Sequence, residues 1–309
     1  MARIDILLAT YDSIAFLEQT IDSILQQDTT DWRILICDGG STDATVEIIE
    51  QYTRRYPEKI FYVPSQKPLS VCENFSVLLD KSCSDYVMFC DHDDIWLPDK
   101  ISKTWDAMKQ AQQQYSPRTP LLVFTDKCVV DDKLAVINDS YFKYQKLNPQ
   151  NNQLRHLLVQ NVASGCTMML NRSLVDLCSP IPSEAVMHDH WVSLTATIFG
   201  KIIYLDEPTV LYRQHDRNYY GASNYGWPYF IRRYNEGMGT IRNRFYQNVR
   251  QAAALRTHFS GRLQPEFDEL LKDFSSLREY SWMKRRKILI RHQILKTGFR
   301  RNIGMFLIV

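Results

Sequence analysis

The sequence lacks the features of disulfide-bonded and membrane-spanning proteins. Its seven cysteines are odd in number, include no Cys-x-x-Cys pair, and in several cases lie in apolar runs where a thiol acts as a small hydrophobic group. We therefore expect free cysteines and a reducing compartment. No uncharged apolar run approaches the roughly 20 residues that span a bilayer. A strand-like run, Ile4 to Ala9, opens the chain without a signal-peptide pattern, so we expect a cytoplasmic protein at the inner face of the cell membrane.

Glycine-rich nucleotide loops are also missing. The segment Asp38-Gly39-Gly40-Ser41 lacks the third glycine of the dinucleotide fingerprint, and no Walker lysine follows it. An NAD-dependent dehydrogenase is therefore disfavoured. Thr10-Tyr11-Asp12 supplies no Gly/Lys loop that could grip phosphates near the N-terminus. A nucleotidyltransferase or Mg²⁺-dependent phosphohydrolase is kept as an alternative, and so is a non-catalytic module that binds a sugar-nucleotide.

Acidic residues are unevenly spread and disappear after Glu279. Residues 1–220 contain 20 Lys and Arg against 29 Asp and Glu, and residues 221–309 contain 17 against 6. The two parts therefore have net charges of −9 and +11, which give the overall +2. This asymmetry predicts an acidic body over residues 1–220 and a basic, helical region over residues 221–309 that faces an anionic partner.

The first half of the chain alternates apolar strands with helical patterns, which predicts an α/β fold with a parallel sheet covered on both faces. Strands are expected at residues 4–9, 32–37, 60–63 and 86–90, and helices at 70–79 and 98–114. The later pattern is looser. Further strands are expected at 128–130, 134–137, 166–170, 202–205 and 209–212, with a helix at 189–199 and a loop or lid at 217–227.

Polar clusters follow three of the expected strands. They are Thr10-Tyr11-Asp12, Asp38-Gly39-Gly40-Ser41 and Asp91-His92-Asp93-Asp94. Ligands of open parallel sheets bind outside the carboxyl ends of the strands, so the three clusters predict one shared site.

The acidic cluster predicts a divalent metal ion. Asp91, Asp93 and Asp94 follow an uncharged strand, where three carboxylates repel one another unless a cation lies among them. Carboxylate oxygens favour Mg²⁺ or Mn²⁺, which commonly bridge proteins to substrate phosphates. The alternative is an acidic loop in which Asp94 or Asp99 caps the next helix.

The other clusters leave more than one interpretation open. Asp38 is suited to accept a hydrogen bond from a pyrimidine imide, while Ser41 or Thr42 could simply cap a helix. The ring of Tyr11 either stacks on a base or packs against its neighbours. Asp189, between His188 and His190, is better placed to act as a single general base than to bind metal with them, because adjacent helical residues cannot share one ion.

The segment after the last expected strand contains further candidates. Arg213 or Arg217 could neutralise a pyrophosphate leaving group, and His215 could complete a metal site. A lone histidine is as readily structural.

Together these segments resemble family 2 glycosyltransferases over about residues 3–220. The motifs that carry the resemblance are Leu8 to Asp12, Ile36 to Asp43 and Phe89 to Asp94. Three more segments resemble a bacterial subgroup of surface-polysaccharide enzymes that includes many rhamnosyltransferases: residues 164–167, 188–191 and 212–215. The resemblance implies a GT-A fold for residues 1–220, which is Rossmann-like with a mostly parallel sheet, and a helical extension for residues 221–309.

The resemblance also implies roles for individual residues. Asp189 matches the catalytic base, although many family members have Glu-Asp where this chain has His188-Asp189. The implied metal ligands for Mg²⁺ or Mn²⁺ are Asp91, Asp93 and His215. The implied substrate-binding residues are Thr10, Tyr11, Asp12, Asp38, Gly39, Asn74, Asp91, His92, Trp191 and Arg213.

The implied reaction is an inverting transfer in which an acceptor oxygen displaces a nucleoside diphosphate from a sugar. The expected donor is dTDP-rhamnose, or otherwise a UDP-sugar, and the expected acceptor is a glycan or a lipid-linked glycan in cell-surface polysaccharide synthesis.

The basic residues of 282–309 alternate with apolar residues, which is typical of helices that lie on anionic membranes. The alternative is a basic region that packs on the body of the protein or on a second subunit of a homo-oligomer. No base-reading motif accompanies the charge, so nucleic acid is not an expected partner.

Overall fold

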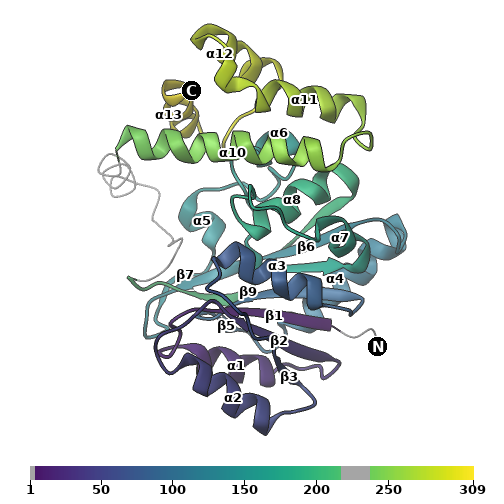
Figure 1. Cartoon of the computed structure of the whole chain (residues 1–309), viewed down its shortest axis with the longest axis vertical. Helices are drawn as coiled ribbons and strands as arrows, with labels where there is room; N and C mark the ends of the chain where they lie inside the picture. Colours follow the sequence, from purple (N-terminus) through teal and green to yellow (C-terminus); the bar gives the residue numbers. More distant parts are fainter. Residues whose placement is uncertain (1–3, 217–236) are drawn as a thin grey trace.

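The computed structural model describes residues 4–216 and 237–309, and it contains one mixed sheet between layers of helices (Figure 1). The strands are β1 (Ile4–Thr10), β2 (Trp32–Asp38), β3 (Ile60–Tyr62), β4 (Tyr86–Asp91), β5 (Ile95–Trp96), β6 (Leu121–Val130), β7 (Val136–Asn138), β8 (Met168–Asn171) and β9 (Lys201–Arg213). The longer helices of the body are α1 (Leu17–Leu25), α2 (Thr45–Arg55), α3 (Val71–Lys81), α4 (Lys100–Tyr115), α7 (Arg172–Cys178) and α8 (His188–Phe199).

Shorter helices connect these elements, and a helical layer follows them. The short ones are α5 (Tyr141–Gln145), α6 (Leu154–Leu157) and the 3-10 turns η1 (Gly165–Thr167) and η2 (Leu277–Glu279). The last part contains α10 (Met238–His258), α11 (Pro265–Ser275), α12 (Trp282–Arg291) and α13 (Phe299–Ile308). None of the helices in residues 4–216 and 237–309 is long and apolar enough to cross a membrane.

The sheet has the order β3-β2-β1-β4-β8-β6-β9-β5, with β7 paired to β6. The β3-β2-β1-β4 half and the β6–β9 pair are parallel, while β5, β7 and β8 run antiparallel to their neighbours. Most of the paired residues in the sheet belong to parallel strand pairs, which confirms the predicted α/β fold.

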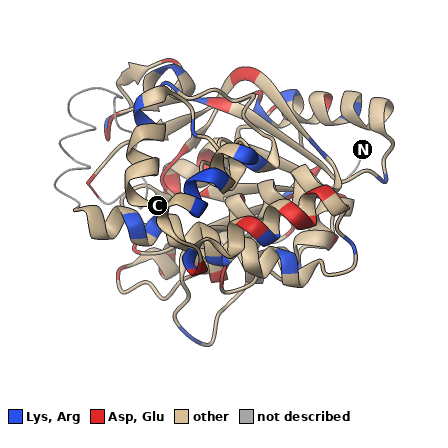
Figure 2. Ribbon diagram, turned by 90° about the horizontal axis from the view of Figure 1, so that it is seen from above, with Lys and Arg blue, Asp and Glu red and all other residues tan. Residues whose placement is uncertain are grey.

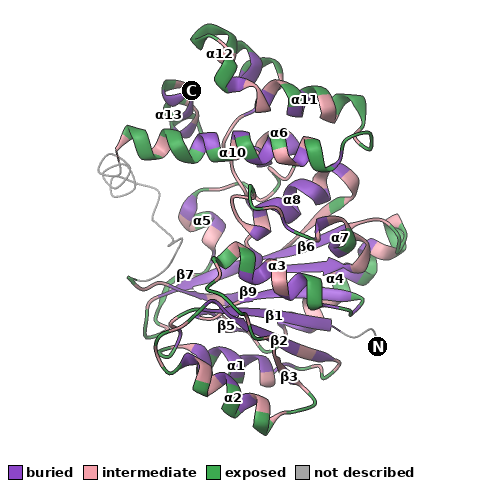
Figure 3. Ribbon diagram, in the orientation of Figure 1, coloured by how far each residue is buried: buried purple, intermediate pink, exposed green. Residues whose placement is uncertain are grey.

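The strands read as continuous apolar runs because both faces of the sheet are covered (Figure 3). In β1, Ile6 and Leu8 pack on one side with α1, α2 and α4, whereas Leu7 and Ala9 pack on the other side with α3, α7 and α8. Successive side chains of a strand point to opposite faces, so each apolar run contributes side chains to both hydrophobic cores.

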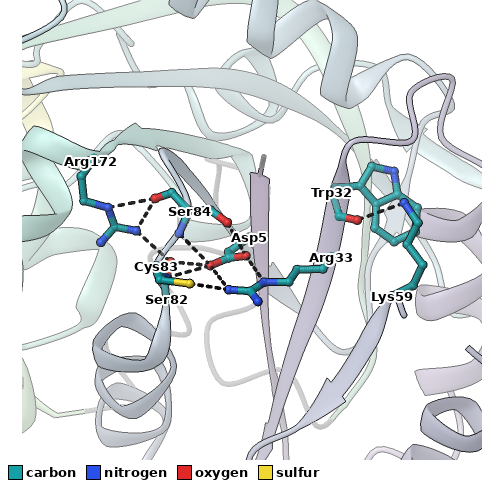
Figure 4. Close-up of polar contacts among 8 residues, drawn as sticks. All are labelled: Asp5, Trp32, Arg33, Lys59, Ser82, Cys83, Ser84 and Arg172. Atoms are coloured by element: carbon teal, nitrogen blue, oxygen red, sulfur yellow. Dashed lines mark hydrogen bonds and ion pairs between the residues drawn. The ribbon is translucent and has the colours of Figure 1, made fainter. Parts of the chain in front are cut away.

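A buried carboxylate holds the first two strands to the loop before β4 (Figure 4). Asp5 is fully buried, and its oxygens accept hydrogen bonds from Arg33 Nε at 2.5 Å, Ser82 Oγ at 2.8 Å and Ser84 Oγ at 2.7 Å. Burial alone would raise the pKa of Asp5, but these hydrogen bonds and the charge of Arg33 outweigh burial and lower it. The charged form is therefore the one that the fold stabilises.

The expected strand pair at 202–205 and 209–212 is a single strand, which corrects that prediction. β9 continues through Asp206-Glu207-Pro208 and pairs with β6 on both sides of this segment. The register shifts between Thr125 and Asp126 and again between Asp126 and Cys128, so bulges absorb the break in the sequence pattern.

The helices after residue 237 pack on the body through a shared core. Phe245, Val249 and Leu255 of α10 belong to the same buried cluster as Trp191 and Leu194 of α8. A buried polar contact joins the same helices, because Gln251 Nε2 lies 3.2 Å from His190 Nδ1. The predicted domain boundary at residue 220 and the predicted loop at 217–227 lie outside the described residues, so the division remains a prediction.

Candidate active site

The ends of β2, β1 and β4 meet at one edge of the sheet. Thr10 is the register partner of Asp38, and Ala9 is the register partner of Asp91. The three polar clusters that follow these strands are therefore neighbours, as the sequence pattern predicts.

Asp38 is tightly held at the end of β2. Its Oδ1 accepts from Thr10 Oγ1 at 2.8 Å and from Ser41 Oγ at 2.6 Å, and its Oδ2 accepts from the N–H groups of Gly40 at 2.9 Å and Ser41 at 2.7 Å. Two donors for each oxygen fill the usual capacity of a carboxylate. A base can bind to Asp38 only by displacing one donor, and the half-buried Ser41 hydroxyl is the one that can rotate away. Neither Ser41 nor Thr42 caps α2, whose N-cap is Ala44.

Tyr11 and Asp12 follow β1 and form the rim of the candidate site beside Asp38. The Tyr11 side chain is 54% exposed, which leaves its ring accessible to a flat ligand. Asp12 has a φ of 43°, in the left-handed region, and its Oδ1 accepts from the N–H of Thr42 at 2.8 Å. The rim is thus fixed to the β2 loop.

Gly39 and Asn74 hold the ends of β1 and β2 close together. A Cβ on Gly39 would lie 3.1 Å from the Leu69 carbonyl oxygen and 3.3 Å from that of Thr10, so the close approach needs glycine. Asn74, buried on α3, donates to the Thr10 carbonyl at 3.3 Å. Its Oδ1 is buried and finds no hydrogen-bond partner within the described residues.

The fold shifts the pKa values of the carboxyl groups in the acidic cluster in different directions. Burial and the charge of Asp93 raise the pKa of Asp91 to about 6, and the same two causes raise that of Asp94 well above its usual range. Burial would also raise the pKa of Asp93, but hydrogen bonding to His215 and the nearby His92 hold it below its usual value. Asp93 is therefore the carboxylate that stays charged.

His215 faces Asp93 directly. Its Nε2 lies 3.0 Å from Asp93 Oδ2, and its ring stacks on Phe16 with the ring centroids 4.7 Å apart. The half-buried His92 is fixed through its backbone, since its carbonyl accepts from Thr20 Oγ1 at 2.9 Å. The structure thus brings His215, from the end of β9, to the cluster at the end of β4.

The residues present fit a divalent cation. Oxygens of Asp91 and Asp94 and the Cys166 sulfur lie within 4.8 Å of one another, and Asp94 Oδ2 is buried without a hydrogen-bond partner in the described part of the chain. Two carboxylates held so close need a counter-charge. Hard cations such as Mg²⁺ and Mn²⁺ select oxygen over a thiol, so the carboxylates of Asp91 and Asp94 fit such an ion better than the Cys166 sulfur.

Asp94 does not cap a helix. The N-cap of α4 is Asp99, which makes no capping hydrogen bond with its side chain. Asp94 is fully buried instead, and its Oδ1 accepts from the backbone N–H of Arg213 at 3.2 Å. The acidic loop is therefore held by β9.

Arg213 lies behind the cluster rather than in front of it. Its guanidinium is buried and donates to the Asp93 carbonyl at 2.9 Å, the Asp132 carbonyl at 2.9 Å and Gln19 Oε1 at 2.7 Å. These contacts use all three nitrogens. The predicted contact between Arg213 and a leaving diphosphate is therefore corrected, because the side chain positions the loop of Asp93. Arg217 lies outside the described residues.

Asp189 is half-buried in the first turn of α8. Its Oδ2 accepts from the N–H of Gly165 at 3.1 Å, and the N-cap of α8 is Met187, so Asp189 is not the helix cap. Burial raises the pKa of Asp189 to about 6, the hydrogen bond from Gly165 lowers it, and the charge of Asp91 raises it further. Gly165, which donates to Asp189, directly precedes Cys166, whose sulfur lies within 4.8 Å of oxygens of Asp91 and Asp94, so Asp189 lies on the side of the acidic cluster. A carboxyl group with this pKa is ionised at neutral pH and is suited to accept a proton.

His188 packs beneath this turn. It is buried, stacks on Phe75 with the centroids 3.8 Å apart, and has both ring nitrogens unpartnered in the described structure. Burial lowers its pKa to about 3, so the ring is neutral. A Cβ on Gly165 would lie 2.5 Å from His188 Nε2, which explains the glycine at that position.

Trp191 lies in the core, which corrects its expected role in substrate binding. The side chain is fully buried, its Nε1 donates to the Cys178 carbonyl at 3.2 Å, and its ring lies edge-on to His258 at 5.6 Å between centroids. These contacts leave no surface for a substrate.

Two buried lysines beside the cluster were not predicted. Lys127 of β6 and Lys100 of α4 are both buried, and Lys100 Nζ donates to the Cys166 carbonyl at 2.9 Å and to Thr209 Oγ1 at 3.3 Å. The sequence signal was the charged pair Asp126-Lys127, which looks like a break between two strands but lies inside continuous β6.

Comparisons with known proteins show similarity to glycosyl transferases. The model of the family described as "Glycosyl transferase family 2" matches residues 5–176. The dTDP-rhamnosyl transferase RfbG of Shigella flexneri is 28% identical over 252 residues, which cover 78% of this chain and 81% of that protein.

Solved structures show the same fold. The mannosyltransferase PcManGT of Pyrobaculum calidifontis, in complex with GDP-Man and Mn²⁺, has a TM-score of 0.58 at 15% identity, over 99% of this chain and 79% of that one. TarS of S. aureus has a TM-score of 0.57 at 14% identity over 90% of this chain, which spans only 44% of the TarS chain.

The family model spans more than half of the sequence, and its matched region contains the three strand-end clusters. The chain therefore belongs to glycosyltransferase family 2, whose enzymes transfer a sugar from a nucleotide-sugar.

Proposed function

We propose that the chain transfers a sugar onto an acceptor hydroxyl by a single inverting displacement, with Asp189 as the general base. The observation that carries the proposal is the placement of Asp189, whose Oδ2 is fixed by Gly165 at 3.1 Å and whose pKa of about 6 responds to Asp91. A general base and an acidic cluster at the same sheet edge can act on the two partners of one reaction. The base acts on the acceptor hydroxyl, and the cluster acts on the leaving diphosphate.

Each part of the site has one task in this reaction. Tyr11, Asp12 and Asp38 hold the nucleotide at the ends of β1 and β2, and Asp189 takes the proton of the acceptor hydroxyl as its oxygen attacks the anomeric carbon. A divalent cation bound by Asp91, Asp93 and His215 supplies positive charge for the leaving diphosphate.

For the donor we propose dTDP-rhamnose first and a UDP-sugar second. Support comes from the Shigella flexneri relative, which is a dTDP-rhamnosyl transferase, and from TarS structures that contain UDP or UDP-GlcNAc. The exposed ring of Tyr11 suits stacking on either pyrimidine.

The test is the Asp189→Asn variant. We expect acceptor-dependent transfer to fall at least roughly 1,000-fold, because an amide cannot take the proton, while dTDP binding measured by calorimetry stays near wild type. Wild-type turnover in the variant would refute the role of Asp189. Nucleotide binding by wild-type protein without turnover of any donor and acceptor would instead favour a non-catalytic binding module.

For the acceptor we propose a lipid-linked glycan in surface-polysaccharide synthesis, reached at an anionic membrane through α12 and α13. Trp282, Phe299 and Leu307 are 61%, 79% and 69% exposed, and together with Ile303 they line one open groove of about 450 Å³ between the two helices. Contiguous exposed apolar surface of this kind marks an interaction site.

The charges of this region narrow the proposal. Of its basic residues, Arg285 and Arg301 donate to backbone carbonyls within the fold, and Arg291 pairs with Glu269 at 2.6 Å. The side chains of Lys284, Lys287 and Arg300 are exposed on α12 and α13. Figure 2 shows basic segments of the ribbon around the C-terminus. A symmetric dimer through this groove would bring the basic residues of the two copies together, so an anionic surface is the better partner.

Vesicle flotation tests this membrane contact. We expect wild-type protein to float with vesicles that contain phosphatidylglycerol but not with neutral vesicles, and F299S/L307S to stay at the bottom. The matched control is V136S/I137S, which changes two exposed apolar residues of the β6–β7 hairpin. Equal flotation of all three proteins would exclude the groove as the contact.

A further inference from the structure

A polar pocket lies where α10 and α13 meet the start of α8. It has a volume of about 200 Å³, and its wall includes Val186, His190, Arg244, Lys296 and Ile308. Pockets that enclose a whole drug-sized ligand have volumes of roughly 300–1,000 Å³. This smaller pocket is therefore suited to a single polar group of a larger molecule.

Hydrogen bonds hold α10 against the turn that contains Asp189. Gln251 Oε1 accepts from the N–H of Val186 at 2.7 Å, and Gln251 Nε2 lies 3.2 Å from His190 Nδ1. Arg244 lies about two turns before Gln251, on the same face of α10. That face is directed at α8, which explains why Arg244 lines the pocket together with His190.

The pocket is positively charged. Arg244 and Lys296 contribute cations, and none of the described residues that line the pocket is acidic. His190 adds no charge, because burial lowers its pKa to about 4 and its Nε2 already lies 2.6 Å from the Leu157 carbonyl oxygen. The rest of the polar wall consists of side-chain amides, from Gln160, Asn161, Gln247 and Asn248. Cationic and amide N–H groups around a small pocket are the donors that bind phosphate oxygens.

The pocket adjoins the apolar groove between α12 and α13. Leu295 and Leu307 line the groove. The residues that directly follow them, Lys296 and Ile308, line the pocket. Consecutive Cα atoms are only about 3.8 Å apart, so the groove and the pocket meet on α13 and on the segment before it. On its other side the pocket reaches the first turn of α8, which contains Asp189.

We propose that this pocket binds the phosphate or diphosphate group that joins the acceptor glycan to its lipid. The lipid then lies in the groove of α12 and α13, the phosphate lies beside Arg244 and Lys296, and the glycan extends toward Asp189. The three parts of the acceptor are joined in that same order. The inference rests on the proposed function, because it assumes a lipid-linked acceptor, but its test measures binding rather than turnover.

The experiment measures the binding of farnesyl diphosphate, a short lipid diphosphate, by calorimetry. Mn²⁺ and a saturating nucleoside diphosphate, dTDP or UDP, fill the donor site, so that the probe reports a second site. We expect the variant Arg244→Gln/Lys296→Gln to bind farnesyl diphosphate roughly 10- to 100-fold more weakly than wild type, as for lost charged hydrogen bonds, and to bind the nucleotide equally well. Unchanged binding of farnesyl diphosphate, an equal loss for the nucleotide, or no binding by wild type would overturn the proposal.

Inorganic pyrophosphate identifies the source of the phosphate. We expect wild type to bind it at least roughly tenfold more weakly than farnesyl diphosphate, because it buries no apolar surface in the groove. The variant F299S/L307S should lose that difference, since both residues line the groove. Equal affinity of wild type for the two probes would indicate a site for free phosphate and would overturn the assignment to the acceptor.

Two further variants keep the outcomes apart. Arg250→Gln/Lys272→Gln removes the same charge from exposed positions of α10 and α11 and should bind farnesyl diphosphate like wild type. An equal loss in this control would reduce the effect to overall charge and contradict the proposal. Gln247→Glu places a negative charge at an exposed position of the pocket wall, so it repeats the test if the melting temperature shows that Arg244→Gln/Lys296→Gln does not fold. Wild-type affinity in Gln247→Glu would likewise overturn the proposal.

The proposed function fails separately from this inference. It fails if wild-type protein releases no nucleoside diphosphate from any donor tested, whatever the affinity for farnesyl diphosphate. Sugar transfer by a protein in which Arg244→Gln/Lys296→Gln leaves this affinity unchanged would instead overturn the phosphate pocket alone.

Discussion

At the scale of single residues, the site depends on carboxyl groups whose pKa values the fold shifts in opposite directions. Asp93 is kept charged beside His215, whereas Asp91 and Asp189 have pKa values of about 6. Two acids with raised pKa values at a sheet edge favour proton transfer near neutral pH.

The pH dependence of turnover follows from these values. At saturating donor and metal, we expect kcat to be flat above about pH 7 and to fall about tenfold per pH unit below pH 6, because protonated Asp189 cannot act as a base. Mn²⁺ affinity measured at the same pH values separates loss of the base from loss of the metal. A rate that is unchanged between pH 7 and pH 5 would contradict this assignment.

A second prediction concerns Gly165. In Gly165→Ala the new Cβ would lie 2.5 Å from His188 Nε2, and His188 cannot retreat because it stacks on Phe75. We expect a loss of about 2 kcal/mol in the free energy of unfolding and a loss of activity, since the Gly165 N–H orients Asp189.

Urea denaturation measures the change, and Gly304→Ala is the control because nothing lies within 4 Å of its new Cβ. Adding His188→Ala should recover part of the stability by removing the clash. If Gly165→Ala is as stable and active as Gly304→Ala, the contact does not constrain the site.

Sequence patterns predicted most of the site residues at the strand ends, but they did not predict which nearby side chains are buried in the core. Asp38, Asp91 and Asp93 could be placed because the carboxyl ends of parallel strands share an edge. Trp191 and Arg213 were assigned to substrate because a motif gives the position of a residue but not the direction of its side chain. Lys127 was missed because the charged pair Asp126-Lys127 interrupts the apolar pattern, whereas both residues lie inside continuous β6.

At the scale of elements, the sheet edge depends on how β1, β2 and the α3–β4 loop are joined. Asp5 accepts from Arg33 of β2 and from Ser82 and Ser84 of the loop (Figure 4). The functional ends of β1 and β2 lie at the other end of the same two strands, so this contact also fixes their relative position.

The variant Asp5→Asn tests this hydrogen-bonded contact. At pH 7 we expect the variant to lose about 3 kcal/mol of unfolding free energy, because it leaves Arg33 without its charged partner. Asp85→Asn, an exposed acid of the same loop, is the control. Since the fold lowers the pKa of Asp5, its contribution is full above the unfolded value of 3.8 and is lost as the pH falls through the folded value. The difference between variant and wild type should therefore narrow below pH 4, and a constant difference would contradict the electrostatic explanation.

Element prediction succeeded where periodicity was uninterrupted. The strands β1, β2 and β4 and the helices α3 and α4 were expected close to their observed bounds because apolar runs and caps coincide there. β9 was divided in two because Asp206-Glu207-Pro208 interrupts the apolar pattern, whereas backbone pairing with β6 carries the strand across it. Tertiary pairing overrode the local signal.

At the scale of the whole molecule, helix α8, which contains Asp189, lies between the sheet and the C-terminal helices (Figure 1). Phe259 follows α10 and is fully buried, and its ring lies tilted against that of Phe199 at the end of α8, with 4.6 Å between the centroids. The charge asymmetry of the sequence suggested two parts, and one of the two buried hydrophobic clusters in the described residues contains side chains of both α8 and the helices after residue 237.

One cooperative transition is therefore expected on unfolding in urea, with circular dichroism and tryptophan fluorescence reporting the same midpoint. Phe259→Ala should lower the free energy of unfolding by about 3 kcal/mol, as for a large buried side chain, and so lower the midpoint. The transition should remain single. Two separated transitions would show that the helices after residue 237 fold independently of the body.

The most direct test of the central claim is the product released from the donor. Wild-type protein with Mn²⁺ and dTDP-rhamnose or a UDP-sugar should release the nucleoside diphosphate in an acceptor-dependent reaction that EDTA stops and that Asp93→Ala loses. Release of pyrophosphate or inorganic phosphate instead, or full activity of Asp93→Ala in EDTA, would contradict metal-dependent sugar transfer at this sheet edge.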